Sequence, residues 1–372
     1  MELTHGVERS SANKTYAVRV GEDRPGGFSI GRDGTMTSIR DCKPKDDGDF
    51  SGSASGMPVV VFVADDHYAM PLAAAISSVV ANLGKNQKIQ VFIVDGHVSS
   101  SNKQKIAQLE DRRRVRIQWL QPSESHFDLL RSLPCGYVGK SAYYKLLIPE
   151  LLGPAYQRIL YLDCDVVVEG DITELWYADV GKNYVLAVRD LINPFVSSPF
   201  GLKNWRELGR QPSDELFNTG VLVFNTAKWR KENATNRLVR YLRENSRYIR
   251  LCDQDAMNAV FGDTWGRLDP RWNVLPYMHI ARSYSLLSKK SHEDLLARAK
   301  LLHYCGPHKP WNTCCGHPRR DRFFHYLDLT VWSGWRPKWW SFDRGDFSYY
   351  GRRFTAMVRQ MVSSVSRDKG IL

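Results

Sequence analysis

The chain has 372 residues, 43% of them hydrophobic, and a formal net charge of +12. This length allows one large domain or two smaller ones, and the composition is that of an ordinary globular protein with a sizeable core. The positive charge indicates an anionic partner, such as a nucleic acid, an anionic lipid or a phosphorylated small molecule, but it does not indicate a fold.

The cysteines and the apolar segments exclude several other classes of protein. Seven cysteines are scattered along the chain, and no CxxC pair occurs, which argues against a disulfide framework and against a zinc signature. The first residues lack the apolar segment of a signal peptide. No stretch approaches the roughly 18 apolar residues of a spanning helix. We therefore expect a cytoplasmic protein, either soluble or attached peripherally to the inner face of the plasma membrane.

Residues 1–57 differ in composition from the rest of the chain. They are polar and rich in glycine, serine and aspartate. We expect a flexible or weakly structured N-terminal extension that ends in a linker, and we assign it no function.

The next part of the chain alternates between strand and helix patterns. Continuous β-branched and apolar runs at residues 59–66 and 89–96 predict strands buried on both faces, and a third strand is expected at 115–120. Helical patterns follow the first strand at 70–83 and the second at 99–111, where serines supply N-cap candidates. This alternation predicts an α/β fold with a mostly parallel, Rossmann-like sheet and crossover helices.

The elements after residue 140 are less regular. The segment 141–152 has a helical pattern up to Pro149, where we expect the helix to end, and a fourth buried strand is expected over 157–165. The remaining expected elements are strands at 183–188, 220–225 and 299–305 and helices at 227–245 and 253–261.

Polar side chains gather at the predicted strand ends, where open α/β sheets bind their ligands. This coincidence is the first indication of function. The residues concerned are Asp65, Asp66, Asp95, Asp163, Asp165 and His303.

The carboxylates of Asp163 and Asp165 interrupt the apolar run "YLDCDVVV". In an extended chain they point to the same side, and two like charges resist burial unless a cation lies between them. Oxygen ligands suit Mg²⁺ and Mn²⁺. The alternative is a strand end at which both carboxylates are solvated or cap a turn.

Five segments distinguish these possibilities: "FVADDHY", "YLDCDVVV", "FNTGVLVFN", "CDQDAMNAVF" and "LLHYCGPHKPW". In this order they resemble the family 8 glycosyltransferases, which are retaining enzymes of the GT-A fold. The resemblance runs from about Pro58 to about Trp335, and its last segment is specific. It implies a GT-A domain over 58–335, between the extension of residues 1–57 and a C-terminal tail of residues 336–372.

The resemblance implies a metal site. Asp163 and Asp165 match the DxD motif of the family, and His303 matches its third metal ligand. Taken alone, a single histidine after a strand would be a core residue. Two carboxylates and an imidazole are reasonable ligands for the implied cofactor, Mn²⁺ or Mg²⁺.

The resemblance also implies a binding site for a UDP-galactose or UDP-glucose donor. Gly306 and Lys309 match positions that contact the diphosphate, where glycine permits close backbone approach and lysine supplies a compact charge. Lys145 matches a basic position near the donor at which arginine is common; the alternative is a solvated helical lysine. The implied donor-binding positions are Ala64, Asp65, His67, Lys145, Asp163, Cys164, Asp165, Asn218, Gly306 and Lys309.

The uridine would lie at the end of the first strand. Ala64, Asp65 and His67 match the segment of the family that holds it, with Asp65 accepting from the base or the ribose. The family frequently has asparagine at the position of His67.

The implied catalytic positions are Gln254, Asp190 and Asp253. Asn218 and Gln254 would bond the hydroxyls of the transferred hexose, and Asp253 would orient the sugar or Lys145. Retention of configuration usually requires a carboxylate nucleophile, and Gln254 is a weak one. Two mechanisms stay open: a front-face reaction, in which the leaving phosphate accepts the proton of the acceptor, and attack by Asp190.

The acceptor is expected to be a glycan or glycolipid of the lipopolysaccharide type. Residues 193–216 contain three prolines, aromatic side chains expected to be exposed, and no strand period. They are expected to form a loop over the active site that recognises the acceptor. The alternative is a surface insertion.

The tail of residues 336–372 carries eight Lys or Arg against three Asp, and nine aromatic residues lie between Trp332 and Phe354. Apolar residues at helical spacing predict an interfacial helix on an anionic membrane, and bacterial members of the family often carry such a tail. One alternative is packing on the catalytic domain. The other is binding of single-stranded nucleic acid, but no nucleic-acid recognition motif accompanies these basic and aromatic residues. We therefore expect no nucleic-acid partner.

The competing interpretation is a non-catalytic protein that binds a nucleotide sugar or a polyanion on the same fold. Intact Asp163, Asp165 and His303 favour the enzyme, which would be a metal-dependent retaining hexosyltransferase.

Overall fold

The computed structural model describes residues 56–111, 113–134, 140–280, 287–306, 308–313 and 315–338. All of them belong to the second of two compact units, Lys45–Leu372. The N-terminal extension predicted at residues 1–57 lies almost entirely outside the described residues, and so does most of the predicted tail at 336–372. The domain boundaries at residues 57 and 335 therefore stay predictions.

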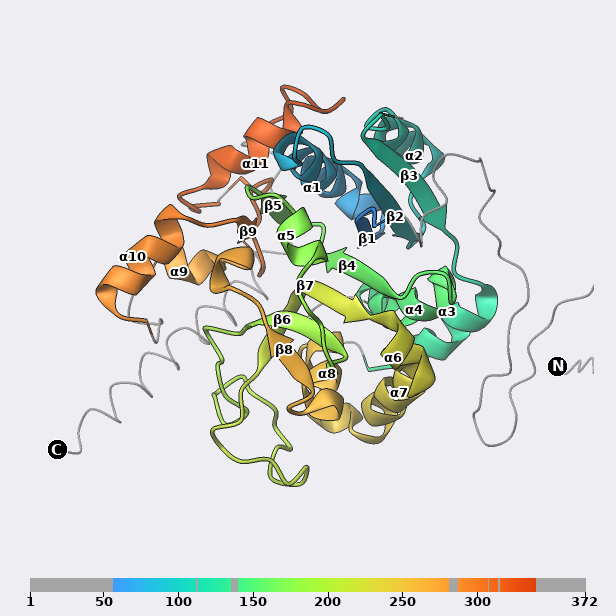
Figure 1. The fold of residues 1–372 in the computed structure, drawn as a ribbon, viewed down its shortest axis with the longest axis vertical. Coiled ribbons are helices and arrows are strands. Elements are labelled where there is room, and N and C mark those ends of the chain that lie inside the picture. The colour runs from blue at the N-terminus through green and yellow to red at the C-terminus, as the bar shows by residue number, and fades with distance from the viewer. Residues whose placement is uncertain are drawn as a thin grey trace, which may run out of the picture. The chain divides into compact units, whose positions relative to one another are not determined.

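The first strands and helices alternate as the sequence predicts (Figure 1). They are β1 (Val59–Ala64), α1 (Ala69–Asn82), β2 (Ile89–Asp95), α2 (Ser100–Ala107) and β3 (Val115–Leu120). The three strands are parallel and lie in the order β3-β2-β1. The predicted serine cap is confirmed, because the Ser99 side chain accepts a hydrogen bond from the backbone N–H of Asn102.

The sheet continues beyond β1 with strands from the second half of the chain. They are β4 (Arg158–Leu162), β6 (Val185–Arg189), β7 (Phe217–Asn225) and β8 (Trp265–Arg267). The order is β3-β2-β1-β4-β7-β6-β8, in which only β7 is antiparallel to its neighbours. The predicted α/β class with a mostly parallel, Rossmann-like sheet is therefore confirmed.

The predicted fourth strand is too long. It ends at Leu162, the chain turns at Asp163–Asp165, and a separate strand β5 (Val166–Val168) follows. β5 pairs antiparallel with β9 (Leu301–His303) in a second, two-stranded sheet. The predicted last strand thus exists but is shorter and lies outside the main sheet.

Long-range hydrogen bonds hold the turn between β4 and β5. The backbone N–H of Asp163 donates to the Gly220 carbonyl at 2.9 Å, and the backbone N–H of Tyr304 donates to the Asp165 carbonyl at 2.8 Å. These hydrogen bonds satisfy backbone groups of the turn that, in one continuous strand, would have bonded to a neighbouring strand. The turn, rather than the strand pleat, therefore brings the two carboxylates together.

Two predicted helices also differ in detail. Pro149 does not end a helix: a 3₁₀ helix, η2 (Lys140–Leu147), leads into α4 (Ile148–Leu152), and the proline lies in the first turn of α4, where its missing N–H costs nothing. The helix predicted at 227–245 is two helices, because Asn233 adopts a left-handed conformation with a φ of 51°. These are α6 (Thr226–Lys231) and α7 (Ala234–Glu244).

The predicted helix at 253–261 is confirmed as α8 (Asp253–Phe261). The other α-helices are α3 (Glu124–Arg131), α5 (Thr173–Trp176), α9 (Pro276–Ile280), α10 (Lys289–Ala297) and α11 (Arg320–Leu327). Short 3₁₀ helices are η1 (Asp66–Tyr68), η3 (Ser246–Tyr248) and η4 (Pro270–Trp272). Among the described residues, no helix has the length and hydrophobicity that crossing a bilayer requires.

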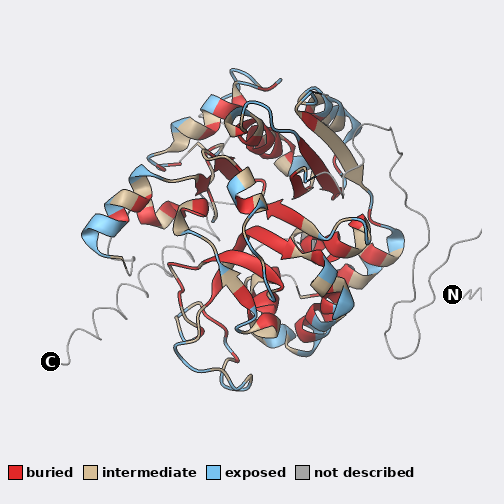
Figure 2. Ribbon diagram, viewed as in Figure 1, coloured by how far each residue is buried: buried red, intermediate tan, exposed pale blue. Residues whose placement is uncertain are grey.

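The core lies on both faces of the main sheet, whose inner strands are buried almost throughout, whereas the edge strand β3 is largely half-buried (Figure 2). Successive residues of β1 pack into different clusters: Val59 and Val61 into one, Val60 and Phe62 into the other. Side chains of a strand alternate between faces, so both faces are covered. Ligand groups are therefore confined to the ends of the strands.

Candidate active site

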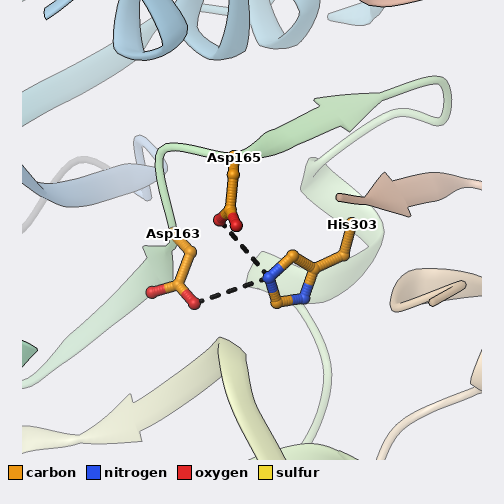
Figure 3. A group of neighbouring side chains, drawn as sticks. All are labelled: Asp163, Asp165 and His303. Atoms are coloured by element: carbon orange, nitrogen blue, oxygen red, sulfur yellow. Dashed lines mark ion pairs between the residues drawn. The ribbon is translucent and has the colours of Figure 1, made fainter. Parts of the chain in front are cut away.

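Two carboxylates and an imidazole meet beside the small sheet. Asp163 and Asp165 lie in the turn between β4 and β5, and His303 is the last residue of β9, paired with Val166. One ligand atom from each lies within 4.8 Å of the others. His303 Nε2 is 3.6 Å from Asp163 Oδ2 and 3.3 Å from Asp165 Oδ1 (Figure 3). The three side chains could hold one divalent cation, and their donor atoms suit Mn²⁺ or Mg²⁺.

A glycine leaves room for this arrangement. A Cβ atom at Gly220, on β7, would lie 2.8 Å from Asp163 Oδ2, 2.8 Å from His303 Nδ1 and closer still to Cε1 of the same ring. Any side chain at this position would therefore displace the imidazole or the carboxylate. The sequence analysis did not single out Gly220, because nothing local in "FNTGVLVFN" shows what faces it.

Lys145 is buried, with a side chain that is 3% exposed. Its Nζ lies 2.8 Å from Asp253 Oδ2 and 3.4 Å from Asp163 Oδ1, and it donates to the Thr219 carbonyl at 2.9 Å. Burial alone would lower the pKa of this ammonium, but the Asp163 and Asp253 carboxylates outweigh it and raise the pKa above its ordinary value. The alternative of a solvated lysine is therefore wrong.

Lys309 holds the other carboxylate. Its Nζ forms an ion pair with Asp165 and donates to the Tyr304 carbonyl at 3.0 Å. Burial alone would raise the pKa of the Asp165 carboxyl, but Lys309 and His303 hold it well below its usual range. Both lysines suggested by the sequence thus lie at the carboxylate pair.

The charges of this cluster nearly cancel. Asp163, Asp165 and Asp253 face the ammonium groups of Lys145 and Lys309, which leaves one excess negative charge when His303 is neutral. A divalent cation held there would reverse the sign of this excess, and the cluster would then attract an anion.

Three more of the predicted residues form a hydrogen-bonded row. Gln254, in the first turn of α8, donates from Nε2 to Asp190 Oδ2 at 3.2 Å and accepts at Oε1 from Asn218 Nδ2 at 3.2 Å. Burial raises the pKa of the Asp190 carboxyl, although hydrogen bonds from the backbone N–H groups of Asn193 and Ile192 act in the opposite direction. The row thus runs from Asp190 through Gln254 to Asn218.

The predicted uridine segment lies at the carboxyl end of β1. Asp65 is half-buried and caps η1 by accepting from the Tyr68 backbone N–H at 3.2 Å, while His67 is exposed. The Cys164 thiol donates to the Val63 carbonyl at 3.1 Å, so it is engaged with β1. Gly306 has a φ of 87°, a conformation that favours glycine.

Two other aspartates at strand ends support loops. Asp95 forms an ion pair with Lys103 and accepts from the backbone N–H of Val98 at 2.8 Å. Asp66 accepts from the backbone N–H of Ser99 and the side chain of Asn102, both at 2.8 Å. These contacts give both carboxylates a role in holding the start of α2.

The loop of residues 193–216 begins and ends near Asp190, at one end of the hydrogen-bonded row, because the backbone N–H of Asp190 donates to the Leu216 carbonyl at 2.8 Å. It contains no helix or extended strand. Its aromatic side chains, expected to be exposed, are half-buried: Phe195 packs under Arg189, and Trp205 packs on the loop's own small core. The loop therefore has its own packing.

Several known proteins are similar to this chain in sequence and in fold. The sequence model of glycosyl transferase family 8 matches residues 59–315. General stress protein A of Bacillus subtilis is 29% identical over 279 residues, which cover 74% of this chain and 94% of that protein. Lipopolysaccharide 1,2-glucosyltransferase of Escherichia coli is 27% identical, over 75% of this chain and 80% of that protein. The crystal structure of the galactosyltransferase LgtC with donor and acceptor sugar analogs matches with a TM-score of 0.63 and 26% identity, and covers 77% of this chain and 99% of LgtC.

The fold and the relatives together define the class: this protein is a glycosyltransferase with the GT-A fold. The chain belongs to glycosyl transferase family 8, as its motifs predict.

Proposed function

We propose that this protein transfers galactose or glucose from a UDP-sugar to a hydroxyl of a glycan or glycolipid, with retention of configuration and with Mn²⁺ or Mg²⁺. The observation that carries the proposal is the convergence of Asp163, Asp165 and His303 with two lysines, the buried Lys145 and the half-buried Lys309. The names of two relatives, a lipopolysaccharide 1,2-glucosyltransferase and a galactosyltransferase, support a hexose donor.

Asp163, Asp165 and His303 would hold the metal ion, which supplies charge neutralisation at the departing diphosphate when it is bound. Lys145 and Lys309 would stabilise the same developing charge. Gly306 would let the backbone approach the phosphates, with Cys164 contributing through its place between the two aspartates. The uridine would be held by Ala64, Asp65 and His67.

Gln254 and Asn218 would bond the hexose. Asp190 already accepts hydrogen bonds from two backbone N–H groups and from Gln254. These bonds engage both oxygens of the carboxylate, Oδ1 with the two backbone N–H groups and Oδ2 with Gln254, which favours the front-face mechanism over attack by Asp190. In that reaction the acceptor oxygen bonds to the anomeric carbon, the bond to the leaving phosphate breaks, and a phosphate oxygen takes the acceptor proton. The contact of Asp253 with Lys145 supports an orienting role for Asp253 toward the lysine.

A panel of nucleotide sugars tests this function. With Mn²⁺, we expect slow hydrolysis of UDP-galactose or UDP-glucose and an upward shift of the unfolding temperature by the donor that binds. Without the ion both effects should shrink. A shift without turnover of any donor would instead favour the non-catalytic binder, and neither effect with any donor would contradict the proposed donor class.

Membrane attachment of the tail is a separate part of the proposal. Residues 336–372 carry much of the excess positive charge, which favours an anionic lipid surface on the cytoplasmic side, where a glycolipid acceptor would be found. The loop of residues 193–216 would face that acceptor. Truncation after Trp335 should release the protein from anionic liposomes in a co-sedimentation assay. Unchanged co-sedimentation of the truncated chain would contradict the membrane role.

A further inference from the structure

Asn273 lies between His303, a candidate metal ligand, and Asn218, the last residue of the hydrogen-bonded row. The proposed function gives Asn273 no role. It follows η4 and is 2% exposed. Its Nδ2 donates to Asn218 Oδ1 at 2.8 Å, and its Oδ1 lies 2.9 Å from His303 Nδ1. Asn273 is therefore the link between His303 and the residues proposed to bind the sugar.

The backbone holds Asn273 in this place. Val274, the next residue, donates its N–H to the Leu301 carbonyl at 2.9 Å and accepts from the His303 N–H at 3.0 Å. The segment thus runs along β9, and its register with His303 is set by two main-chain bonds. A side chain held by its backbone on a neighbouring segment is suited to positioning another side chain.

Two backbone donors fix the direction of every bond in the row. The N–H of Gly220 donates to Asn218 Oδ1 at 2.9 Å, and the N–H of Thr219 donates to Gln254 Oε1 at 3.4 Å. A backbone N–H can only donate, so both side-chain atoms are oxygens. Asn218 Oδ1 must therefore receive the NH₂ group of Asn273, and the carbonyl oxygen of Asn273 must face His303.

This orientation determines which nitrogen of His303 carries the proton. The Asn273 carbonyl is an acceptor only, so Nδ1 must be the donor. The Nε2 lone pair of the neutral ring then points between Asp163 and Asp165, as the ring orientation in Figure 3 shows. An imidazole binds a metal ion through such an unprotonated nitrogen, and the partner of the other nitrogen selects it.

We propose that Asn273 is a positioning residue: it holds His303 in the Nδ1–H form and thereby presents Nε2 as a metal ligand. The inference deepens the proposed function and rests on its metal site. The same amide donates to Asn218, so Asn273 also connects the proposed metal site to the proposed sugar site through hydrogen bonds.

Two substitutions separate positioning from simple packing. Asn273→Leu removes both the acceptor for Nδ1 and the donor to Asn218, whereas Asn273→Asp keeps the acceptor in nearly the same shape and loses only the donor. We expect the affinity of the protein for Mn²⁺, titrated by calorimetry without donor, to fall about 10- to 100-fold in Asn273→Leu, the range for lost outer-shell partners. Asn273→Asp should lose clearly less affinity than Asn273→Leu, because it keeps the acceptor for His303 Nδ1.

Asn225→Leu is the matched control, since Asn225 caps α6 at the other end of β7 and its loss lowers stability without reaching His303. It should leave the Mn²⁺ affinity unchanged. Wild-type Mn²⁺ affinity in Asn273→Leu, or an equal loss in all three variants, would overturn the inference.

The tautomer of His303 is a second readout, taken from long-range ¹H–¹⁵N spectra of the protein with and without Mg²⁺. We expect Nδ1–H in the wild type and in Asn273→Asp, and loss of this preference in Asn273→Leu. An Nε2–H ring in the wild type would overturn the inference. If the wild type binds no Mn²⁺ and yet shows Nδ1–H, the metal part of the proposed function fails while the positioning by Asn273 stands.

Discussion

Replacing Asp165 with asparagine is expected to lower donor turnover by at least about 100-fold, the scale for loss of one electrostatic stabiliser in a transition state. Asp165 is 7% exposed and contacts both His303 and Lys309. The substitution removes a charged metal ligand and leaves the Lys309 ammonium without its carboxylate. Turnover of the UDP-sugar and the Mn²⁺ affinity of the protein should fall together.

Asp128→Asn is the control for this substitution, since Asp128 is an exposed partner of Arg131 on α3, and its side chain is 58% exposed. It should leave turnover, Mn²⁺ affinity and stability unchanged, because exposed ion pairs contribute little. An Asp165→Asn variant that kept both wild-type turnover and wild-type Mn²⁺ affinity would contradict the metal site.

Gly220→Ala disturbs the same site by a steric route that changes no charge. The added methyl group would lie 2.8 Å from both Asp163 Oδ2 and His303 Nδ1, so the ligands must separate. We expect about a tenfold or larger loss of Mn²⁺ affinity, comparable to disturbing the support of a metal ligand. Gly316→Ala, where an added Cβ meets nothing within 4 Å, is the control and should bind Mn²⁺ like the wild type.

Lys145→Met is expected to have the largest effect on stability. The ammonium and the Asp253 carboxylate are 3% and 6% exposed, so removal of the lysine leaves a buried charge without its partner. Breaking such a pair costs about 3–5 kcal/mol in the free energy of unfolding. Donor turnover should fall as well, because a cation near the proposed diphosphate site is lost. Chemical denaturation and a turnover assay measure the two effects.

The double variant Lys145→Met/Asp253→Asn distinguishes these effects. It removes both buried charges and leaves an acceptor for the Thr219 hydroxyl, which donates to Asp253 at 2.8 Å. We expect it to regain most of the lost stability while turnover stays low. Lys289→Met, at an exposed pair with Glu293, is the control and should change stability by less than about 0.5 kcal/mol. Recovered turnover in the double variant would exclude Lys145 from the proposed electrostatic role.

Local patterns determined much of the fold. The run that became β1 is apolar throughout, and the run that became β2 is largely apolar, because both faces of the sheet are covered. This burial is visible in the residues themselves. Helix α8 matches its predicted bounds for a similar reason, since its periodicity is local. The carboxylate pair and the histidine were also identifiable, because their residue types and their order along the chain match a family pattern.

The tertiary structure alone decided how these parts meet. The run at 157–165 looks like one strand, yet the strand ends before Asp163 because the chain that follows, β5, pairs with β9 in the small sheet. The burial of Lys145 depends on Asp253, 108 residues away, and the role of Asn273 depends on His303, 30 residues away. Hydrophobic periodicity reports which face of an element is covered. It carries no information on which polar partner, brought from a distant segment by strand order, will satisfy a buried group.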